Sequence, residues 1–599
     1  MDKELDLFDR LEVFWQELVR RRVVHVAGVY AIASWIVVYM VATTYEKLFL
    51  PDSVLLTFVA LAFLGFPVVL VLAWYFRLGR GGVRFRRAGA TDDGAYGDSR
   101  AAGNAAGAVL LLFGLALATG SFLAVADRLI PAASPAGVIE EGSVAVLPFE
   151  NLSGEESNRY FSDGMTEEVI ARLARIPDLK VISRTSAMRY RDTELEPAQI
   201  GRELGVAALL EGSVQRDGDR LRISARLVDT RTARALWAES YDRTLEDVFA
   251  IQTDLAERIA TSLGLALAGV APATAAAPAL PTSDLEAYDL YLRGRFFWNQ
   301  RSPEGLARSI ELFEEAIARD PDFHMAHAGL ADAWVVMPYH TGGSAGNALD
   351  RALEAAGHAL ELQPELGEAH AARAFALTGR WAWDEAEAEF RHALELSPGY
   401  ATGHEWHAVL LLARGRSREA RGAIERAAAL DPMSRVISYV HGLILFVSGD
   451  PEAALSHLDR ALELDPGFPL AHLHRGWVLE ELGQNEEMVE AVERWNALLP
   501  ELAFAPGALR EAYVEGGREG AFGLLADLPP EVPASALDRA RWSLRLGRTD
   551  EALDWLERGL EDRDVWFVIV NASPAIDALR TEPRFRALLQ AMNLEEPRG

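Results

Sequence analysis

The chain has 599 residues, half of them hydrophobic, with a formal net charge of −29 and no cysteine. This length predicts several domains rather than one core. The acidic balance argues against nucleic acid as a partner, because phosphate recognition needs clustered Lys and Arg. Without cysteine, the chain has no disulfide, no thiolate nucleophile and no Cys-ligated metal.

Three apolar stretches stand out near the N-terminus. Residues 23–45, 54–76 and 105–126 contain no Asp, Glu, Lys or Arg. Each is longer than the ~20 residues that a helix needs to cross the hydrocarbon core. We therefore predict a tail at residues 1–22 and three transmembrane α-helices within residues 23–130, with the lipid bilayer as a partner. The absence of charge inside the stretches argues against an ion pathway.

Basic residues around these stretches give the predicted orientation. Only Lys47 lies in the loop between the first two stretches, whereas arginines cluster on the other side, at positions 20, 21, 22, 77, 80, 84, 86 and 87. Because positively charged loops stay in the cytoplasm, three crossings place everything after residue 130 outside it. We expect a multi-pass protein of the inner (cytoplasmic) membrane, whose larger part is periplasmic if the source is a bacterium.

After a short linker at 131–142, the pattern predicts a small α/β domain at residues 143–267. Alternating apolar residues indicate strands, and apolar residues three or four apart indicate helices. Asp217 and Gly218 favour a type I′ hairpin turn, whose two central residues need positive φ. The expected strands cover 143–149, 179–183, 207–214, 221–227 and 236–241, and the expected helices begin at Thr166 or cover 196–204 and 245–265.

Four strings in this domain carry a family resemblance. They are SVAVLPFENLS at 143–153, YFSDGMTEE at 160–168, LEGSV at 210–214 and LWAESYDR at 236–243. In order and spacing they resemble the TolB-like amino-terminal domain, which implies a bacterial signalling protein with tetratricopeptide repeats after this domain. Relatives often carry a cytoplasmic cyclase, kinase or winged-helix domain before the membrane. The predicted 22-residue tail is too short for one, so we expect no such output domain.

The string around Asp163 admits two interpretations. Asp163 and Gly164 could form an anion-binding nest at a helix start. Alternatively, they precede the first turn of a helix that begins at Thr166, where Glu167 and Glu168 match the helix dipole. We favour the second interpretation, because three carboxylates repel an anion.

A repeat begins beyond an Ala/Pro-rich linker at 268–283. A period of 34 residues is the tetratricopeptide signature, and prolines follow it at positions 364, 398, 432, 466 and 500. We predict an all-α solenoid of tetratricopeptide repeats at 284–500, then a degenerate repeat and helical cap at 501–599. Two columns of small residues keep the same step, namely Ala352, Ala386, Ala420 and Ala454, and Ala359, Ala393, Ala427 and Ala461.

One loop of this region matches a catalytic string. Gly342, Ser344 and Gly346 fit G-x-S-x-G, but the nucleophile elbow needs a strand before it. Here the string lies in an insertion between two helices, which we place at residues 337–347. We therefore interpret it as a loop.

Histidines recur at one position of the repeat. His327, His370, His404 and His472 each follow a signature proline by six residues. Neighbouring helices lie ~8–10 Å apart, too far to share a metal whose ligands bind at ~2 Å, so we expect packing residues. His404 and His407 form an alternative surface metal site, although we predict no metal.

The predicted function is a membrane-anchored protein–protein interaction scaffold or sensor, whose repeat groove binds a protein or peptide. Arg373 and Arg475 are the candidate partner-binding residues, because arginine often anchors interfaces. We predict no catalytic residue and no cofactor. The alternative is a hydrolase or transferase activity hidden in the α/β domain, which contains neither His nor Cys, the commonest bases and nucleophiles.

Overall fold

The computed structural model divides the chain into two units, Met1–Pro135 and Ala136–Gly599. The described residues are Tyr30, Ser34, 76–79, 82–85, 139–153, 159–244, 247–264, 281–341, 345–499, 503–532 and 534–594. The three predicted transmembrane stretches lie outside them, apart from Tyr30, Ser34 and Phe76. Among the described helices, none combines the length and the apolar character needed to cross a membrane.

The first unit contains one described element, an antiparallel hairpin. Strands β1 (Phe76–Gly79) and β2 (Gly82–Phe85) pair with Phe76 opposite Phe85. The arginines at positions 77, 80 and 84 predict only a basic loop here. The hairpin is therefore an element that the sequence pattern did not reveal.

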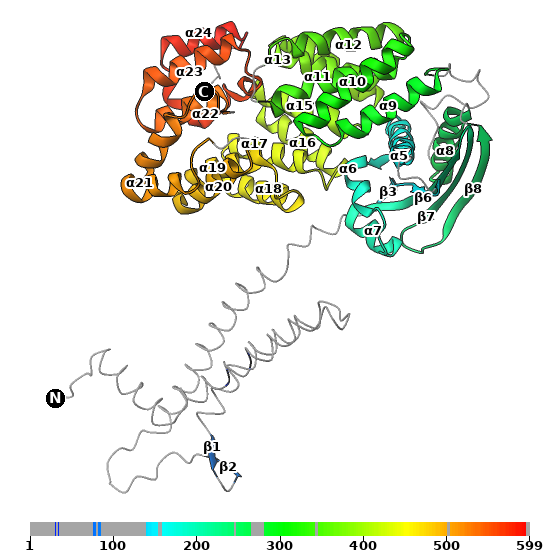
Figure 1. Ribbon diagram of the computed structural model, residues 1–599. Coiled ribbons are helices and arrows are strands. Elements are labelled where there is room, and N and C mark those ends of the chain that lie inside the picture. Colours follow the sequence, from blue (N-terminus) through cyan, green and yellow to red (C-terminus); the bar gives the residue numbers. More distant parts are fainter. Residues whose placement is uncertain are drawn as a thin grey trace, which may run out of the picture. The chain divides into compact units, whose positions relative to one another are not determined.

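The second unit begins with a mixed sheet in the order β5-β3-β6-β7-β8, with β4 also paired to β6 (Figure 1). β3 runs parallel to β5 and β6, whereas β6, β7 and β8 are antiparallel neighbours. The strands are β3 (Glu140–Val146), β4 (Glu150–Asn151), β5 (Lys180–Ile182), β6 (Val206–Asp217), β7 (Arg220–Asp229) and β8 (Ala235–Thr244).

The hairpin between β6 and β7 is confirmed, with a shift of one residue. Asp217 pairs with Arg220, so the turn consists of Gly218 and Asp219 rather than Asp217 and Gly218. Gly218 supplies the positive φ, +58°. The predicted alternation holds, because every second residue from Leu221 to Leu227 is buried.

Helices cover both faces of this sheet. α5 (Arg159–Leu173) and α8 (Val248–Ser262) pack on one face, where Val146 and Leu210 meet Val169 and Leu255 in a common core. α7 (Pro197–Leu204) covers the other face. Two short elements follow β5, namely α6 (Arg184–Ala187) and the 3-10 turn η2 (Met188–Tyr190).

The predicted helical solenoid is present as consecutive antiparallel pairs, α9 to α20 (Figure 1). The first helices of the pairs are α9 (Leu285–Trp298), α11 (His324–His340), α13 (Gly367–Gly379), α15 (Ala401–Ala413), α17 (Arg435–Val447) and α19 (Pro469–Glu481). The second helices are α10 (Pro303–Arg319), α12 (Ala348–Leu362), α14 (Trp383–Leu396), α16 (Ser417–Leu430), α18 (Pro451–Leu464) and α20 (Asn485–Ala497).

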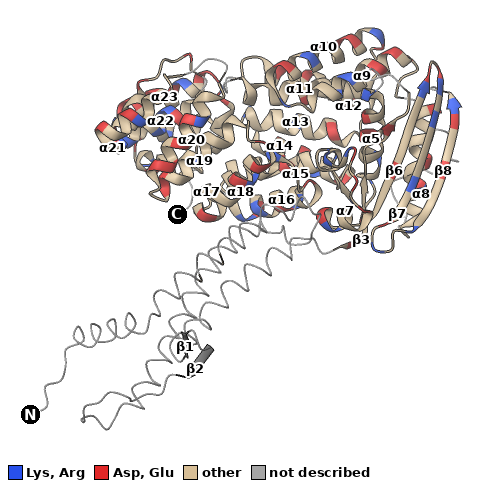
Figure 2. Cartoon of the chain, turned by 60° about the horizontal axis from the view of Figure 1, so that its bottom comes forward, with Lys and Arg blue, Asp and Glu red and all other residues tan. Residues whose placement is uncertain are grey.

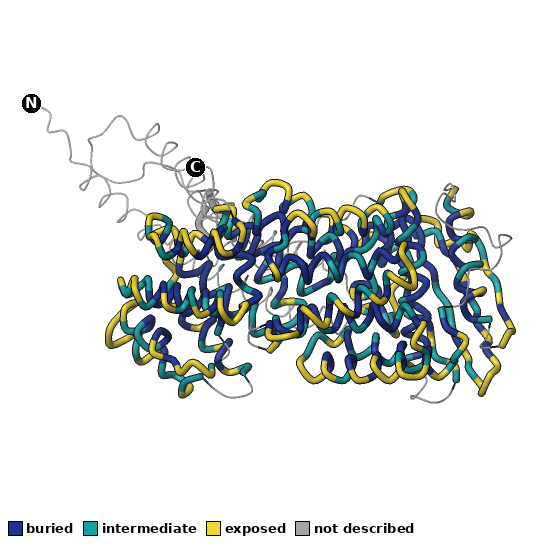
Figure 3. The backbone as a smooth tube through the Cα atoms, turned by 90° about the horizontal axis from the view of Figure 1, so that it is seen from above, coloured by how far each residue is buried: buried dark blue, intermediate teal, exposed yellow. Residues whose placement is uncertain are grey.

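The alanine columns lie where the pattern predicts, inside the pairs, and buried segments run through the interior of the repeats in Figure 3. All eight alanines are completely buried, because a larger side chain would separate the two helices of a pair. Gly415, Gly449 and Gly483 occupy the turn within their repeats, with φ between +73° and +82°. Trp381 and Arg301 adopt the same left-handed conformation in earlier repeats, at +62° and +51°.

The C-terminal region folds back onto the repeats. The Trp383 indole donates to the carbonyl of Met592 over 2.7 Å, and the Trp566 ring meets Tyr339 edge-on at 5.4 Å. The elements after α20 are α21 (Ala508–Ala526), α22 (Ala536–Arg545), α23 (Thr549–Glu561), η4 (Val565–Ile569), η5 (Pro574–Leu579) and α24 (Pro583–Ala591).

Acidic and basic side chains are interspersed over the sheet and the repeats (Figure 2). The acidic balance of the sequence is therefore spread across the surface of the second unit.

Candidate functional site

The string at residues 160–168 lies on α5 and joins the α/β domain to the repeats. α5 packs against α9, the first helix of the solenoid. A Cβ added at Gly164 would lie 2.6 Å from Leu292 Cδ2 on α9. Glycine is therefore the residue that permits this approach of the two helices.

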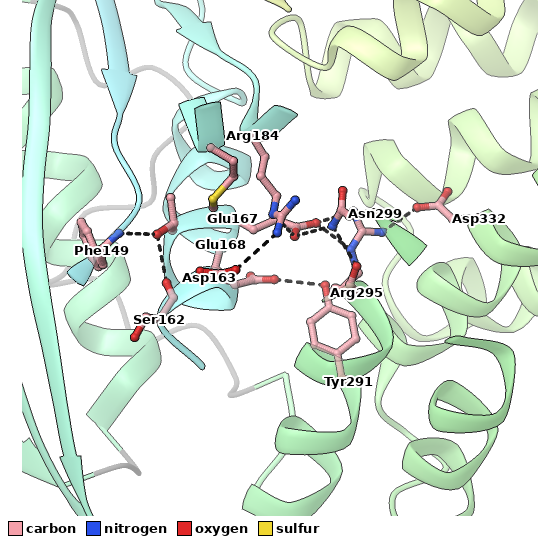
Figure 4. A network of polar contacts seen from close by, with 12 residues as sticks. Phe149, Ser162, Asp163, Glu167, Glu168, Arg184, Tyr291, Arg295, Asn299 and Asp332 are labelled. Atoms are coloured by element: carbon pink, nitrogen blue, oxygen red, sulfur yellow. Dashed lines mark hydrogen bonds and ion pairs between the residues drawn. The ribbon is translucent and has the colours of Figure 1, made fainter. Parts of the chain in front are cut away.

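Carboxylates of α5 extend the contact with ion pairs (Figure 4). Glu167 Oε1 lies 2.6 Å from Arg295 Nη2 and 2.7 Å from Arg295 Nε. Asn299 donates to Glu167 Oε2 over 3.0 Å, and Arg184 pairs with the same oxygen at 3.2 Å. Arg295 also donates to Asp332 Oδ2 over 2.9 Å. One guanidinium therefore connects α5, α9 and α11.

Neighbouring carboxylates of α5 titrate in opposite directions. Burial opposes ionisation of Glu167, but Arg295 and Arg184 outweigh it and hold its pKa below the ordinary value. Burial raises the pKa of Glu168 to about 7, although Arg172 and the hydrogen bond from Tyr291 oppose the rise. The Tyr291 hydroxyl donates to Glu168 over 3.0 Å. The junction therefore holds one carboxylate that is fully ionised and one that titrates near neutrality.

A second contact attaches α6 to the loop between α16 and α17. The Ser186 backbone amide donates to Asp431 Oδ1 over 3.0 Å, and its hydroxyl donates to the same oxygen over 2.5 Å. Backbone bonds also cross the junction, from Ser183 N to Leu430 O at 2.8 Å and from Gly399 N to Ala174 O at 2.9 Å.

The structure contradicts both interpretations of Asp163. α5 already begins at Arg159, so Asp163 and Gly164 lie inside the helix and form neither a nest nor an N-cap. Asp163 is 4% exposed and pairs with Arg191 at 2.5 Å. Asp and Gly are poor helix formers, but these contacts outweigh that preference.

A cavity of ≈ 770 Å³ lies between α5 and α6 on one side and the first helices of the repeats on the other. Five buried polar atoms of its lining residues have no hydrogen-bond partner in the described part of the chain, namely Arg175 Nε, Arg184 Nε, Trp298 Nε1, Asp332 Oδ1 and Tyr400 OH. An unsatisfied buried polar group costs ~1–3 kcal/mol. Several such groups around one cavity indicate a place where a polar molecule binds.

Two charged residues of the same cavity belong to different repeats. The Arg301 guanidinium lies 3.7 Å from the centre of the Trp298 ring, and Glu405 is 8% exposed. Within the described residues, neighbouring charges influence Arg301 and Glu405 electrostatically, without a side-chain hydrogen bond. Burial raises the pKa of Glu405 to about 7, although Arg301 opposes the rise.

No sequence motif identifies Arg295, Arg301, Asp332 or Glu405 as site residues. One signal was available, because Arg301 occupies the turn position that is glycine in three later repeats. The other residues become neighbours only when the two domains pack together.

The repeated histidines are structural. Nε2 of His327, His370, His404 and His472 lies 2.9–3.0 Å from the carbonyl oxygen of the proline six residues earlier. Each imidazole therefore stabilises the loop that precedes the first helix of its repeat. The described residues contain no group of His, Asp and Glu suited to a metal ion, and this covers His404 and His407.

The predicted partner-binding arginines lie on α13 and α19 and do not line the cavity. Arg373 lies 3.5 Å from Glu389 on α14, and Arg475 lies 2.6 Å from Asp459 on α18. Arg373 therefore pairs within its own repeat, whereas Arg475 pairs with the second helix of the preceding repeat. Gly342 and Ser344 of the G-x-S-x-G string lie outside the described residues.

Comparison with known proteins identifies the repeats. The family model of the tetratricopeptide repeat matches residues 406–467 and 439–502. A protein of Rhizobium meliloti (strain 1021), named "Putative adenylate cyclase 3", is 35% identical over 259 residues, which are 43% of this chain and 44% of that protein. The chain therefore spans less than half the length of that relative.

Solved structures resemble parts of the chain. A thermophilic TPR protein of Thermus thermophilus is 16% identical, with a TM-score of 0.28, over 32% of this chain and 99% of that one. The pilF protein of Pseudomonas aeruginosa is 20% identical, with a TM-score of 0.28, over 38% of this chain and 99% of that one. The TolB-like resemblance of residues 143–267 stays a prediction.

Proposed function

We propose that this protein is a membrane-anchored scaffold and sensor, in which the repeats hold a protein or peptide partner. The observation that carries the proposal is the solenoid of tetratricopeptide repeats, a fold that generally mediates protein–protein interactions. The anchor rests on the three uncharged stretches within residues 23–130.

The sensor part of the proposal rests on the junction. A buried ion pair fastens the α/β domain to α9, and hydrogen bonds fasten it to Gly399 before α15 and to Leu430 and Asp431 at the end of α16. A molecule that binds to one domain and changes its packing therefore also acts on the other, because both share the same contacts. The TolB-like resemblance adds a bacterial signalling context.

Topology is tested with reporter fusions. An enzyme that is active only outside the cytoplasm, fused after residue 140, should be active, and the same enzyme fused after residue 90 should be silent. The reverse pattern contradicts the proposed orientation.

Partner binding is tested by proximity labelling with the full chain in its source cells. Arg373→Glu combined with Arg475→Glu should reduce the labelling of the partner while the melting temperature changes little. Arg308→Glu is the matched control, because Arg308 lies on α10, a second helix, and pairs with Glu311 at 2.6 Å. Labelling that is equal in all variants contradicts the role of the two arginines, and labelling without any enriched protein contradicts the scaffold.

The relative named as an adenylate cyclase supports a second candidate, a role in cyclic nucleotide synthesis. The chain spans 44% of that protein, so the activity in its name need not belong to the shared part. Expression of the full chain in cells that lack adenylate cyclase tests this candidate directly. Cyclic AMP production would support the enzyme, and its absence would support the scaffold.

A further inference from the structure

The cavity between the two domains has the dimensions of a ligand site. Its ≈ 770 Å³ lie within the ~300–1,000 Å³ that small-molecule sites occupy. Its walls come from α5 and α6 on one side and from repeats on the other. A ligand there contacts both domains at once.

The cavity is lined by carboxylates that can accept hydrogen bonds from a ligand. Asp332 is 1% exposed, and its Oδ2 accepts from Arg295 while its Oδ1 has no partner among the described residues. Glu405, 8% exposed, lines the same cavity. Carboxylates in such surroundings favour a cation that donates hydrogen bonds, because a buried charge is stable only when it is paired.

The cavity is also lined by groups that can donate hydrogen bonds to a ligand. The Trp298 indole N–H and the Tyr400 hydroxyl are unpaired within the described part of the chain. Arg301 stacks on Trp298 and lies within electrostatic reach of Asp332, Tyr400 and Glu405. A guanidinium held in this way presents a planar set of donors that matches a carboxylate.

The backbone of Arg301 lies in the left-handed region. At φ +51° it occupies a turn position that is glycine in three later repeats, at Gly415, Gly449 and Gly483, and Trp381 at +62° in another. Since Trp381 does not line the cavity, the case for Arg301 rests on the position of its guanidinium beside Trp298.

We propose that this cavity binds a free α-amino acid by its head group, with the ammonium on Glu405 and Asp332 and the carboxylate on Arg301. Adjacent positive and negative groups of the ligand match adjacent acceptors and donors of the site. The remaining volume accommodates the ligand's side chain beside Ile170 and Met325. The proposed partner-binding residues Arg373 and Arg475 do not line this cavity, so amino-acid binding and partner labelling can succeed or fail independently.

The test is isothermal titration calorimetry of the purified full chain with each of the twenty L-amino acids. At least one should bind with one site per chain. Its amide, which lacks the carboxylate, and its N-acetyl derivative, which lacks the ammonium, should each bind at least tenfold more weakly.

Two variants assign the ends of the ligand. Arg301→Gly introduces the residue that three other repeats carry at this turn, so the fold should persist. Arg301→Gly should weaken binding of the amino acid at least tenfold, but it should leave the already weak binding of the amide unchanged. Glu405→Gln should also weaken binding of the amino acid at least tenfold. It should leave the weak binding of the N-acetyl derivative unchanged. Arg308→Ala, on the exposed side of α10, is the control that should bind like the parent.

Failure of all twenty amino acids to bind at millimolar concentration overturns the proposal and indicates a cavity filled by water. Binding that is equally strong in both variants also overturns it, because the ligand then lies elsewhere.

Discussion

Glu167 on α5 and Arg295 on α9 are 128 positions apart in the chain and form an ion pair of 2.6 Å. The same guanidinium holds Asp332 on α11 at 2.9 Å. This arrangement makes the α/β domain and the first repeats one packed unit, with a single buried cation shared between two carboxylates.

Arg295→Met should destabilise the folded chain by about 3–5 kcal/mol, because it leaves buried Asp332 without its ion pair and Glu167 with Arg184 alone. Chemical denaturation of the full chain measures the loss. Arg308→Met, which removes the exposed pair with Glu311, should cost about 1 kcal/mol or less. Equal losses in the two variants contradict the importance of the junction.

Gly164→Ala should cost about 1–3 kcal/mol, because its Cβ collides with Leu292. Leu292→Ala opens space for that Cβ, so the double variant should lose less than the sum of the two single losses. Gly422→Ala on α16 is the matched control, since nothing lies within 4 Å of its added Cβ. It should be neutral or stabilising by up to ~1 kcal/mol. Additive losses in the double-mutant cycle contradict the proposed contact.

Glu168 should make stability depend on pH. Its pKa rises from 4.5 to about 7 on folding, chiefly through burial, so the folded state binds the proton more tightly than the unfolded state. The proton on Glu168 therefore contributes its full stabilisation of the folded state below pH 4.5, and this contribution is lost as the pH rises through about 7. Glu168→Gln should match the parent near pH 4 and exceed its stability by about 1–3 kcal/mol near pH 8. A difference that is constant across this range contradicts the assignment.

Ala454→Leu should overpack α17 against α18 and cost about 1–3 kcal/mol, because Ala454 is completely buried. Ala318→Leu, at an exposed position of α10, should melt like the parent. Thermal unfolding followed by circular dichroism compares the two. If Ala454→Leu also melts like the parent, the repeat register is wrong.

The solenoid was predictable because its signals are local and repeated. Ala420 recurs as Ala386 and Ala454 at fixed steps, and each lies inside a helix pair. The start of α5 was not predictable, because Asp163 and Gly164 favour a break in the helix. Their helical conformation depends on Arg191 and on the approach of Leu292, which no local pattern contains.

The cavity was not predictable for a related reason. Arg301 and Glu405 lie in different repeats, and α5 covers them from another domain. No residue spacing in the sequence predicts that Arg301, Glu405 and α5 line the same cavity. The left-handed turn at Arg301 was the exception, since the repeat period alone assigns glycine to that position in later repeats.

The most direct test of the central claim, that the α/β domain is docked on the repeats, is a disulfide in this cysteine-free chain. Ala174 and Gly399 share a backbone hydrogen bond of 2.9 Å across the junction, and a Cβ on Gly399 would lie 3.1 Å from Ala174 Cβ. Disulfides join Cβ atoms about 3.5–4.5 Å apart, so the two backbone segments must move apart, because the added Cβ would also lie 2.9 Å from Ala174 Cα. Under mild oxidation, Ala174→Cys/Gly399→Cys should form an intramolecular disulfide in most molecules, measured by intact mass after thiol labelling. The control Ala174→Cys/Gly422→Cys should keep both thiols free. Free thiols in the first variant, with the chain folded, would contradict the docked arrangement.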